Sequence, residues 1–341
     1  FIGSNFIHFL LEKTDFSGKV VNIDNLTYAG NCDNLVEIEA KYGGERYFFA
    51  RADIGDHERI KQLLLEHQVD TIVHFAAESH VDRSIFGPRD FIQTNIVGTA
   101  NLLEVAREIW PQRDDVLFHH VSTDEVYGSL GPTGYFYENT SYDPRSPYSA
   151  SKASSDHLVN AYFHTYGLPI TISNCSNNYG PYQFPEKLIP LMSLNLKEEK
   201  PLPVYGDGQN IRDWLYVEDH NQAIWLIVQN GRSGETYNIG GRCEMRNLSV
   251  VETVCDRIDK IRPAATGRSR RALIGFVKDR PGHDRRYAID CSKIETELGW
   301  APEESFETGI DKTIGWYLDN MNWVNRVRGG EYRQWIKKHY G

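Results

Sequence analysis

Over its first 170 residues, the chain alternates between short apolar runs and stretches with helical spacing of hydrophobic positions. The apolar and β-branched runs predict buried parallel strands at Val20–Asp24, Tyr47–Ala50, Thr71–Ala77, Val116–Ser122 and Leu168–Ser173. The helical patterns start near Gly3 and recur over Ile60–His67, Phe91–Ile109 and Ser146–Tyr166. Strands that alternate with helices in this way are typical of a doubly wound parallel α/β sheet.

After Asn174 the pattern changes, because residues 175–215 are rich in Asn, Gly and Pro. A late strand is predicted at Glu235–Gly241 and helices at Ser292–Leu298 and Phe306–Tyr317, while Arg262–Arg271 is interpreted as an exposed basic loop. We expect a larger domain over residues 1–174, rejoined by parts of 213–241, and a smaller α/β domain over 175–341.

The composition narrows the classes of protein to consider. With 341 residues, 40% hydrophobic residues and a formal net charge of −10, the chain is typical of a globular protein and lacks the basic surface of a nucleic-acid binder. No apolar run approaches the ~18 residues that span a bilayer, so we expect no membrane partner. An odd set of scattered cysteines without a CxxC pair predicts reduced thiols, a cytoplasmic location and no metal site: Cys32, Cys175, Cys243, Cys255 and Cys291.

Two residues have the spacing of a dinucleotide site. Gly3 begins a helical pattern, as does the glycine turn before the helix that binds the pyrophosphate in such sites. Asp24 ends the next strand, at the position of the acid that binds the ribose. An acid at this point selects NAD, because a carboxylate repels a 2′-phosphate. The upstream glycines of the motif are absent from the sequence, and we expect the first strand to be missing with them. A helix that happens to start near Gly and a turn Asp would give the same pattern.

Two further motifs carry candidate chemistry. Asp124 and Glu125 follow a strand, where the binding sites of α/β sheets lie, and two carboxyls in one cleft can separate into an acid and a base. Tyr148 and Lys152 lie one helical turn apart, so the ammonium is expected to lower the tyrosine pKa and make the phenol a base. Taken alone, Asp124 and Glu125 are more simply interpreted as a solvated turn, and Tyr148 and Lys152 as surface residues of a helix.

Several longer stretches resemble the dTDP-glucose 4,6-dehydratase family of the extended short-chain dehydrogenase/reductase superfamily. Each is too long to match by chance, and they run from residue 1 to about residue 318: Asn22–Gly30, Ala76–Ser84, Ser122–Gly128, Ser146–His157, Asn174–Pro181, Pro185–Pro190, Ile211–His220 and Asp279–Tyr287. The resemblance implies a Rossmann-type NAD domain and a sugar-nucleotide domain. The loop Ser129–Tyr137 and the tail from Asn320 match nothing useful.

The resemblance also implies a reaction. Tyr148, aided by Lys152, takes the proton of the sugar 4-hydroxyl, which Thr123 binds, while hydride passes from C4 to NAD. Glu125 then removes the C5 proton, Asp124 protonates the departing 6-hydroxyl, and the hydride returns to C6 to give a 4-keto-6-deoxy sugar nucleotide.

The same resemblance implies the binding residues. Cofactor contacts are expected at Gly3, Asp24, Asn25, Leu26, Thr27, Asp53, Ile54, Phe75, Ala76, Ala77, Ser79, Thr94, Tyr148, Lys152 and Asn178. Substrate contacts are expected at Ser79, Thr123, Asn177, Lys187, Leu188, Pro203, Tyr205, Arg212, Asn247, Asp279, Arg280 and His283. Arg212 and Arg280 suit bidentate phosphate binding, and Tyr205 suits stacking on a base. Without the resemblance, a surface cation or a core aromatic is the favoured interpretation of all three.

Three alternatives remain open. A sugar-nucleotide 4-epimerase shares Tyr148, Lys152 and the NAD site but needs no paired carboxylates, so Asp124 and Glu125 argue against it. A dehydratase of UDP- or CDP-glucose differs only in a nucleotide preference that the sequence does not distinguish. A non-catalytic nucleotide-binding protein would be expected to have lost catalytic positions that are all present. By resemblance we also expect a homodimer through Phe91–Ile109 and Tyr148–Tyr166.

Overall fold

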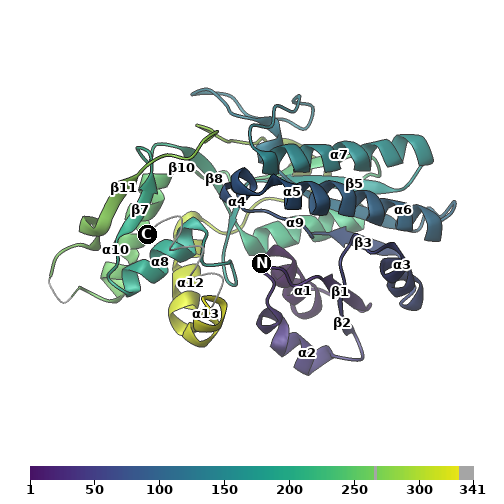
Figure 1. Ribbon diagram of the computed structural model, residues 1–341, viewed down its shortest axis with the longest axis horizontal. Coiled ribbons are helices and arrows are strands. Elements are labelled where there is room, and N and C mark those ends of the chain that lie inside the picture. Colours follow the sequence, from purple (N-terminus) through teal and green to yellow (C-terminus); the bar gives the residue numbers. More distant parts are fainter. Residues whose placement is uncertain (265–266, 330–341) are drawn as a thin grey trace.

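The computed structural model describes residues 1–264 and 267–329 as two lobes, the first on the right of Figure 1 and the second on the left. Six parallel strands form the first lobe. They pair as β1–β2 and as β3–β4–β5–β9, with the bounds β1 Val20–Asp24, β2 Tyr47–Arg51, β3 Thr71–His74, β4 Leu117–Thr123, β5 Ile170–Cys175 and β9 Thr236–Ile239.

Helices cover both faces of these strands, because the alternate side chains of each strand are buried on opposite sides. One core lies between the sheet and α3, α6 and α7, and Phe118 of β4 points into it. The other lies against α1, α9 and α11 and receives Val121 of the same strand. The helix bounds are α1 Ile2–Lys13, α3 His57–Glu66, α6 Thr99–Ile109, α7 Pro147–Tyr166, α9 Val217–Asn230 and α11 Ser292–Leu298. The predicted doubly wound parallel α/β fold is confirmed.

The two groups of parallel strands are not hydrogen-bonded to each other within the described residues. The facing edges of β1 and β3 instead line one cleft, and Val21, Ile23, Ile72 and Val73 are among its walls. Part of this cleft therefore lies inside the first lobe, between two strand edges.

The second lobe contains a three-stranded sheet, β6–β8–β10, and a separate parallel pair, β7–β11. Helices α8, α10 and α12 share its hydrophobic core. The bounds are β6 Asn177–Tyr179, β7 Leu202–Tyr205, β8 Ile211–Tyr216, β10 Glu244–Arg246, β11 Ile274–Val277, α8 Leu188–Lys197, α10 Asn247–Ile261 and α12 Phe306–Asp319.

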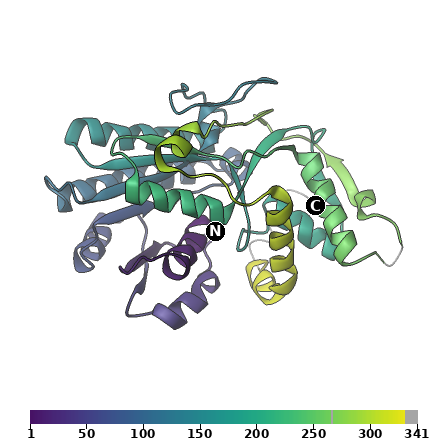
Figure 2. The same ribbon diagram turned by 180° about the vertical axis from the view of Figure 1, so that it is seen from behind.

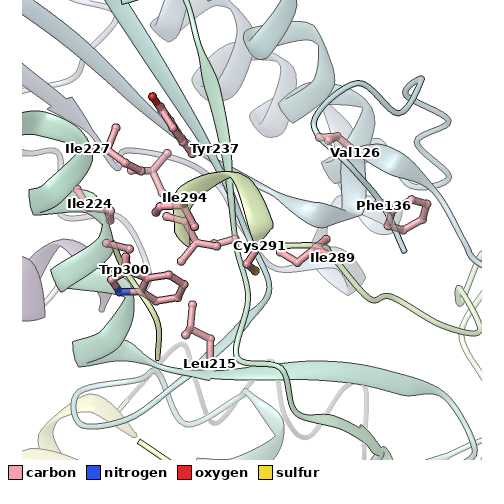
Figure 3. Close-up of a cluster of buried hydrophobic side chains, with 14 of the residues drawn as sticks. Val126, Phe136, Leu215, Ile224, Ile227, Tyr237, Ile289, Cys291, Ile294 and Trp300 are labelled. Atoms are coloured by element: carbon pink, nitrogen blue, oxygen red, sulfur yellow. The ribbon is translucent and has the colours of Figure 1, made fainter. Parts of the chain in front are cut away.

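The chain returns from the second lobe to the first twice. After β8, α9 and β9 rejoin the first lobe, and α11 with Trp300 then completes the same core. Figure 3 shows Ile224, Ile227, Tyr237, Ile294 and Trp300 from these returning segments packed together. The indole nitrogen of Trp300 donates to the backbone oxygen of Asp219 over 3.2 Å. Seen from behind, α9 runs across the first lobe and α12 lies beside the second (Figure 2).

Helix α13 (Met321–Val327) forms another connection between the lobes. Trp323 donates to Asn34 Oδ1 over 2.8 Å, and Arg326 pairs with Asp33. Both acceptors belong to η1 (Cys32–Leu35), which precedes α2 (Val36–Tyr42) in the first lobe. The last described helix therefore holds the two lobes together below the cleft.

Three sequence-based element predictions need correction. Strand β3 ends at His74 rather than Ala77, because its pairing with β4 stops at the His74–His120 pair. The single helix predicted at Phe91–Ile109 is the end of α5 (Pro88–Phe91), a π-helical segment η2 (Ile92–Gly98) and α6. In the predicted loop Arg262–Arg271, Arg270 begins the short helix η4 (Arg270–Leu273). Arg270 is buried and forms an ion pair with Asp259. Residues 265–266 of that loop, and 330–341 of the predicted second domain, lie outside the described residues.

No helix in the described parts of the chain is both long and apolar enough to cross a bilayer. The same residues contain no group of three or more His, Cys, Asp or Glu side chains arranged to hold a metal ion.

Candidate active site

The two candidate carboxyls follow the carboxyl end of β4, in the short helical turn η3 (Asp124–Tyr127). Thr123 caps this turn, because its hydroxyl accepts a hydrogen bond from the Glu125 backbone nitrogen over 3.3 Å. Its hydroxyl also lies 3.4 Å from Asp124 Oδ1, while Asp124 Oδ2 has no hydrogen-bond partner among the residues that the structure describes, and Asp124 is 1% exposed. The strand end therefore presents a buried carboxyl with one oxygen left for a ligand.

Tyr148 and Lys152 lie in the first two turns of α7. The helix start is fixed by a capping box, in which the Ser146 and Ser149 side chains each accept the other's backbone N–H over 3.0 Å, and by Pro147 at the first position. Both Tyr148 and Lys152 are buried against the first lobe. The helix thus places a phenol and an ammonium on the face directed to the end of β4.

Asp124 and Glu125 sit in different electrostatic surroundings. Burial raises the pKa of Asp124 well above its ordinary value, and the neighbouring charges of Glu125 and Asp213 raise it further. Burial also raises the pKa of Glu125, but the cations Arg280, Arg212 and Lys187 oppose that rise. Asp124 is therefore suited to remain a proton donor at neutral pH, while Glu125 is the carboxyl that cations help to ionise.

The tyrosine differs from the sequence-based expectation. Burial raises the pKa of Tyr148 well above its ordinary value, Glu125 raises it further, and a hydrogen bond with Thr123 opposes the rise. The Lys152 ammonium is not among these leading influences. It lies 2.9 Å from the Val121 backbone oxygen and 3.2 Å from His120 Nε2. In this state of the protein, Lys152 is directed to the strand beside it and not to the phenol.

One cleft of about 1590 Å³ brings most candidate residues together. The cleft volume exceeds the ~300–1,000 Å³ of an ordinary small-molecule pocket. Part of this volume lies between β1 and β3. All five catalytic candidates and every cofactor candidate line it, as do the substrate candidates Ser79, Asn177 and Lys187. Thr94 reaches it from the π-helical segment η2, a kind of distortion that often marks functional sites.

The cleft residues suit a dinucleotide such as NAD. Asp24 ends β1 with Oδ1 accepting from the Leu26 backbone nitrogen over 2.7 Å, while Asp53 bonds Asn25 Nδ2 and the Gly55 nitrogen over 2.8 Å each. These bonds fix a carboxylate at the position where a ribose diol is expected. Two of the three Lys152 N–H donors meet Val121 and His120, which leaves one for a ligand hydroxyl in the cleft.

A second group of substrate candidates gathers around a residue that the sequence reasoning missed. Asp82 on α4 (Val81–Phe86) lies with Oδ1 3.1 Å from Arg280 Nη1, and its Oδ2 accepts from the Tyr205 hydroxyl over 3.0 Å. Nearby, His283 Nδ1 lies 2.6 Å from Asp279 Oδ1. Asp82 sits inside the family-like stretch Ala76–Ser84, but only the fold reveals that it reaches the second lobe.

Arg212 lies between the two groups. Its guanidinium stacks on Tyr287 at 4.2 Å and donates to the Asp284 backbone oxygen over 3.0 Å. Its charge influences both Asp124 and Glu125. A buried cation near two carboxyls is suited to bind an anionic ligand at the edge of the cleft.

Three substrate candidates do not join either group. Leu188 packs against the core of the second lobe. Pro203 lines a separate cavity of about 350 Å³ beside Phe276. The backbone nitrogen of Asn247, at the start of α10, donates to the Asn210 oxygen over 2.9 Å. None of these three is among the described residues that line the cleft.

Comparison with known proteins agrees with this geometry. The profile of the GDP-mannose 4,6 dehydratase family matches residues 1–313. A dTDP-glucose 4,6-dehydratase of Salmonella typhimurium is 55% identical over all of this chain and 96% of its own length. The chain belongs to the dTDP-glucose 4,6-dehydratase family.

Solved structures of similar proteins support this family placement. The dTDP-glucose 4,6-dehydratase of Streptomyces venezuelae, solved with NAD bound, is 44% identical with a TM-score of 0.87 and 96% of each chain covered. A UDP-glucuronic acid 4-epimerase of Bacillus cereus is 29% identical with a TM-score of 0.81, over 94% of this chain and 96% of its own. The family's epimerase neighbours thus share the fold at a lower identity.

Proposed function

We propose that this protein is a hydro-lyase that converts dTDP-glucose into dTDP-4-keto-6-deoxyglucose with NAD as cofactor. One observation carries the proposal: the Asp124 and Glu125 carboxyls lie together at the end of β4, in the cleft that also holds Tyr148, with surroundings that separate an acid from a base. An elimination of water needs both a carboxylic acid and a carboxylate base beside the sugar, whereas a 4-epimerisation needs no paired carboxyls.

The residues of the chain divide the chemistry among them. Thr123 binds the oxygen of the sugar 4-hydroxyl, and Tyr148 accepts its proton, with the charge of the Lys152 ammonium favouring the phenolate. When bound, NAD accepts a hydride from C4 and returns it to C6. The 4-ketone acidifies the C5 proton, which Glu125 removes, and Asp124 gives its proton to the departing 6-hydroxyl. When C6 receives the hydride, Glu125 returns a proton to C5, which completes the 4-keto-6-deoxy product.

We assign cofactor binding to the first lobe, residues 1–174 with parts of 213–241. Asp24 binds the ribose hydroxyls, Asp53 and Ile54 lie toward the adenine, and the small residues Ala76 and Ala77 let the cofactor approach the backbone. The negative charge of Asp24 favours NAD over a 2′-phosphorylated cofactor.

We assign nucleotide binding to the remaining residues 175–341, to the extent that the structure describes them. Arg212, Arg280 and Lys187 provide the positive charge for a diphosphate, and Tyr205 the ring for a base. What supports this is that all three cations act on Glu125, so a diphosphate among them places the sugar beside the carboxyls.

We also propose a cytoplasmic homodimer that pairs through α6 and α7. The five cysteines are free thiols, as in proteins of a reducing compartment. Ile92 and Val97, on the same continuous helical segment as α6, and Tyr166 at the end of α7 expose about half of their apolar surface. Light scattering on the purified protein measures its mass in solution, and a monomeric mass contradicts the proposed dimer.

Incubation with dTDP-glucose tests the function directly. The expected product absorbs in alkali as a 4-keto sugar, and its formation needs NAD. Conversion to the galactose epimer alone would overturn the dehydratase in favour of the epimerase. Parallel kinetics with dTDP-, UDP- and CDP-glucose decide the nucleotide, because a preference for UDP- or CDP-glucose contradicts the dTDP assignment while leaving the reaction intact.

A further inference from the structure

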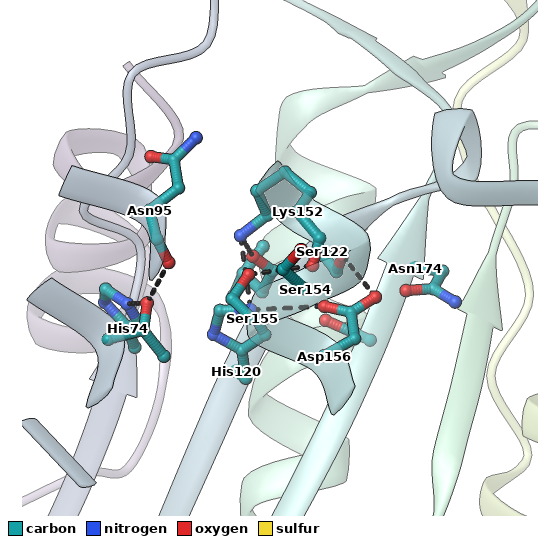
Figure 4. A network of polar contacts seen from close by, with 12 residues as sticks. His74, Asn95, His120, Ser122, Lys152, Ser154, Ser155, Asp156 and Asn174 are labelled. Atoms are coloured by element: carbon teal, nitrogen blue, oxygen red, sulfur yellow. Dashed lines mark hydrogen bonds and ion pairs between the residues drawn. The ribbon is translucent and has the colours of Figure 1, made fainter. Parts of the chain in front are cut away.

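A polar layer lies between β4 and α7, one helical turn beyond the candidate active site (Figure 4). Asp156 follows Lys152 by four residues on the same face of α7, and His120 faces both from β4. Asp156 and His120 are fully buried, and neither is among the residues that line the cleft. Burying a carboxylate is costly, so its partners decide what this layer does.

One nitrogen of His120 is shared by two partners. Its Nε2 lies 3.2 Å from Lys152 Nζ and 3.3 Å from Asp156 Oδ1. A single imidazole nitrogen either accepts a hydrogen bond or donates one, so it serves the ammonium in one tautomer and the carboxylate in the other. His120 therefore bridges the two charges without neutralising either.

The other oxygen of Asp156 is firmly held. Asp156 Oδ2 accepts hydrogen bonds from the Ser122 hydroxyl over 2.8 Å and the Tyr142 hydroxyl over 3.0 Å. Within the described residues, Asp156 Oδ1 has no hydrogen-bond partner, and it lies 3.3 Å from the shared nitrogen of His120. Two fixed donors orient the carboxylate and leave its second oxygen for the bridge to Lys152.

We propose that Asp156 and His120 are positioning residues for the reaction: the Asp156 carboxylate supplies the counter-charge that keeps Lys152 an ammonium, and His120 holds that ammonium at the end of β4. This inference rests on the role proposed for Lys152. It adds a buried control of the lysine charge from one helical turn beyond the cleft, on the same face of α7.

Besides the Tyr142 phenol that donates to Asp156, titratable side chains from four neighbouring positions act on the layer. His74 of β3 lies with its ring 5.0 Å from that of His120, His119 of β4 acts on His120, Cys175 of β5 acts on Lys152, and His157 of α7 acts on Asp156. Burial lowers the pKa values of His74, His119 and His120, and it raises the pKa of Cys175 to about 12. These shifts favour the neutral forms of His74, His119, His120 and Cys175, so Asp156 is the carboxylate that balances Lys152 within the layer.

The sign of the effect follows from the two charged groups. Burial lowers the pKa of Lys152 to about 8, and Asp156 opposes that fall. Burial raises the pKa of Asp156 to about 6, and Lys152 opposes that rise. Both groups are therefore charged between about pH 6 and 8. Without the carboxylate, the lysine loses its proton at a lower pH.

The test compares pH profiles of kcat/KM for 4-keto product formation in Asp156→Asn, Asp156→Glu and the wild type. The Asn variant should move the alkaline limb down by about one pH unit, the usual effect of losing a neighbouring opposite charge. The Glu variant, which keeps the charge, should restore the limb. An Asn variant whose alkaline limb matches the wild type overturns the inference.

His119 provides a matched control for His120. Both are buried on β4, but His119 bonds Thr171 over 2.8 Å and Ser173 over 3.1 Å on the opposite face. His120→Asn should lower kcat about tenfold and shift the alkaline limb, with little change in KM, while His119→Asn keeps the profile. Equal effects of the two histidine variants indicate a structural role and overturn the inference. This comparison still decides the question if Asp156→Asn does not fold.

A Lys152→Ala variant separates this inference from the proposed function. If that variant turns over normally, the role of Lys152 and the inference resting on it are both wrong. If it is inactive while the Asp156 and His120 variants keep the wild-type profile, only the inference fails.

Discussion

Asp82 of the first lobe forms an ion pair with Arg280 of the second, with 3.1 Å between Oδ1 and Nη1. The same carboxylate accepts a hydrogen bond from the Tyr205 hydroxyl. One side chain therefore orients both Arg280, the candidate residue for phosphate binding, and Tyr205, the candidate residue for stacking on the base. The ion pair also spans the two lobes.

Replacing Asp82 by Asn should therefore weaken substrate binding without affecting the chemistry. We expect KM for dTDP-glucose to rise about tenfold, equivalent to ~1.4 kcal/mol, with kcat within a factor of three. NAD affinity, measured by fluorescence titration, should not change. A lower KM would show instead that the carboxylate competes with the substrate phosphates for Arg280.

The two carboxyls of η3 should be separable by isotope exchange. Glu125→Gln removes the proposed base, so the C5 hydrogen should no longer exchange with deuterated solvent, while Asp124→Asn should retain exchange. Turnover should fall at least ~100-fold in both variants. In the double variant, C4 oxidation should persist and absorbance of bound NADH should accumulate. Loss of exchange in the Asp124 variant alone would reverse the assignment.

Asp124 should also weaken the fold at alkaline pH. A carboxyl whose pKa is raised by folding contributes stability that is fully present below its unfolded pKa of ~3.9, and that contribution is lost as pH rises through the folded value. Asp124→Asn avoids this loss. Its Tm should exceed that of the wild type by about 2 °C at pH 8 and match it near pH 4. A lower Tm at pH 8 would contradict the raised pKa.

Asp24 should set the choice of cofactor. Asp24→Asn keeps an acceptor for the Leu26 N–H but removes the negative charge, so NAD affinity should fall about tenfold and discrimination against NADP should weaken. Tryptophan fluorescence titrations with both cofactors measure this. Asp56→Asn is the control, because Asp56 caps α3 outside the cleft. Unaltered NAD binding in the Asp24 variant would remove Asp24 from the site.

The sequence predicted the parallel strands well, because buried strands between helices leave a local hydrophobic pattern. It also predicted that Thr123, Asp124 and Glu125 follow a strand end, since that depends on neighbouring residues alone. It did not predict the π-helical segment Ile92–Gly98, whose apolar positions fit an ordinary α-helix equally well. The early end of β3 was missed as well, because pairing with β4 and not composition decides it.

The environments of the site residues depended on the fold. Asp82 and His120 lie inside or beside motifs that were singled out, yet they meet side chains far along the chain: His120 lies beside Lys152, 32 residues on, and Asp82 pairs with Arg280, 198 residues on. The expectation that Lys152 lowers the Tyr148 pKa came from helical spacing alone. Spacing puts two residues on one face but does not say which neighbour the longer side chain prefers.

The return of the chain to its first lobe determines when that lobe is completed during synthesis. Strand β9 pairs with β5 only after residues 177–216 have been added, and Trp300 fills the same core later still. Domains generally fold from the N-terminus as the ribosome releases them. Here the first lobe waits for nearly the whole chain, so both lobes reach their final structure together, and a nascent chain that stops before Trp300 carries an open apolar core.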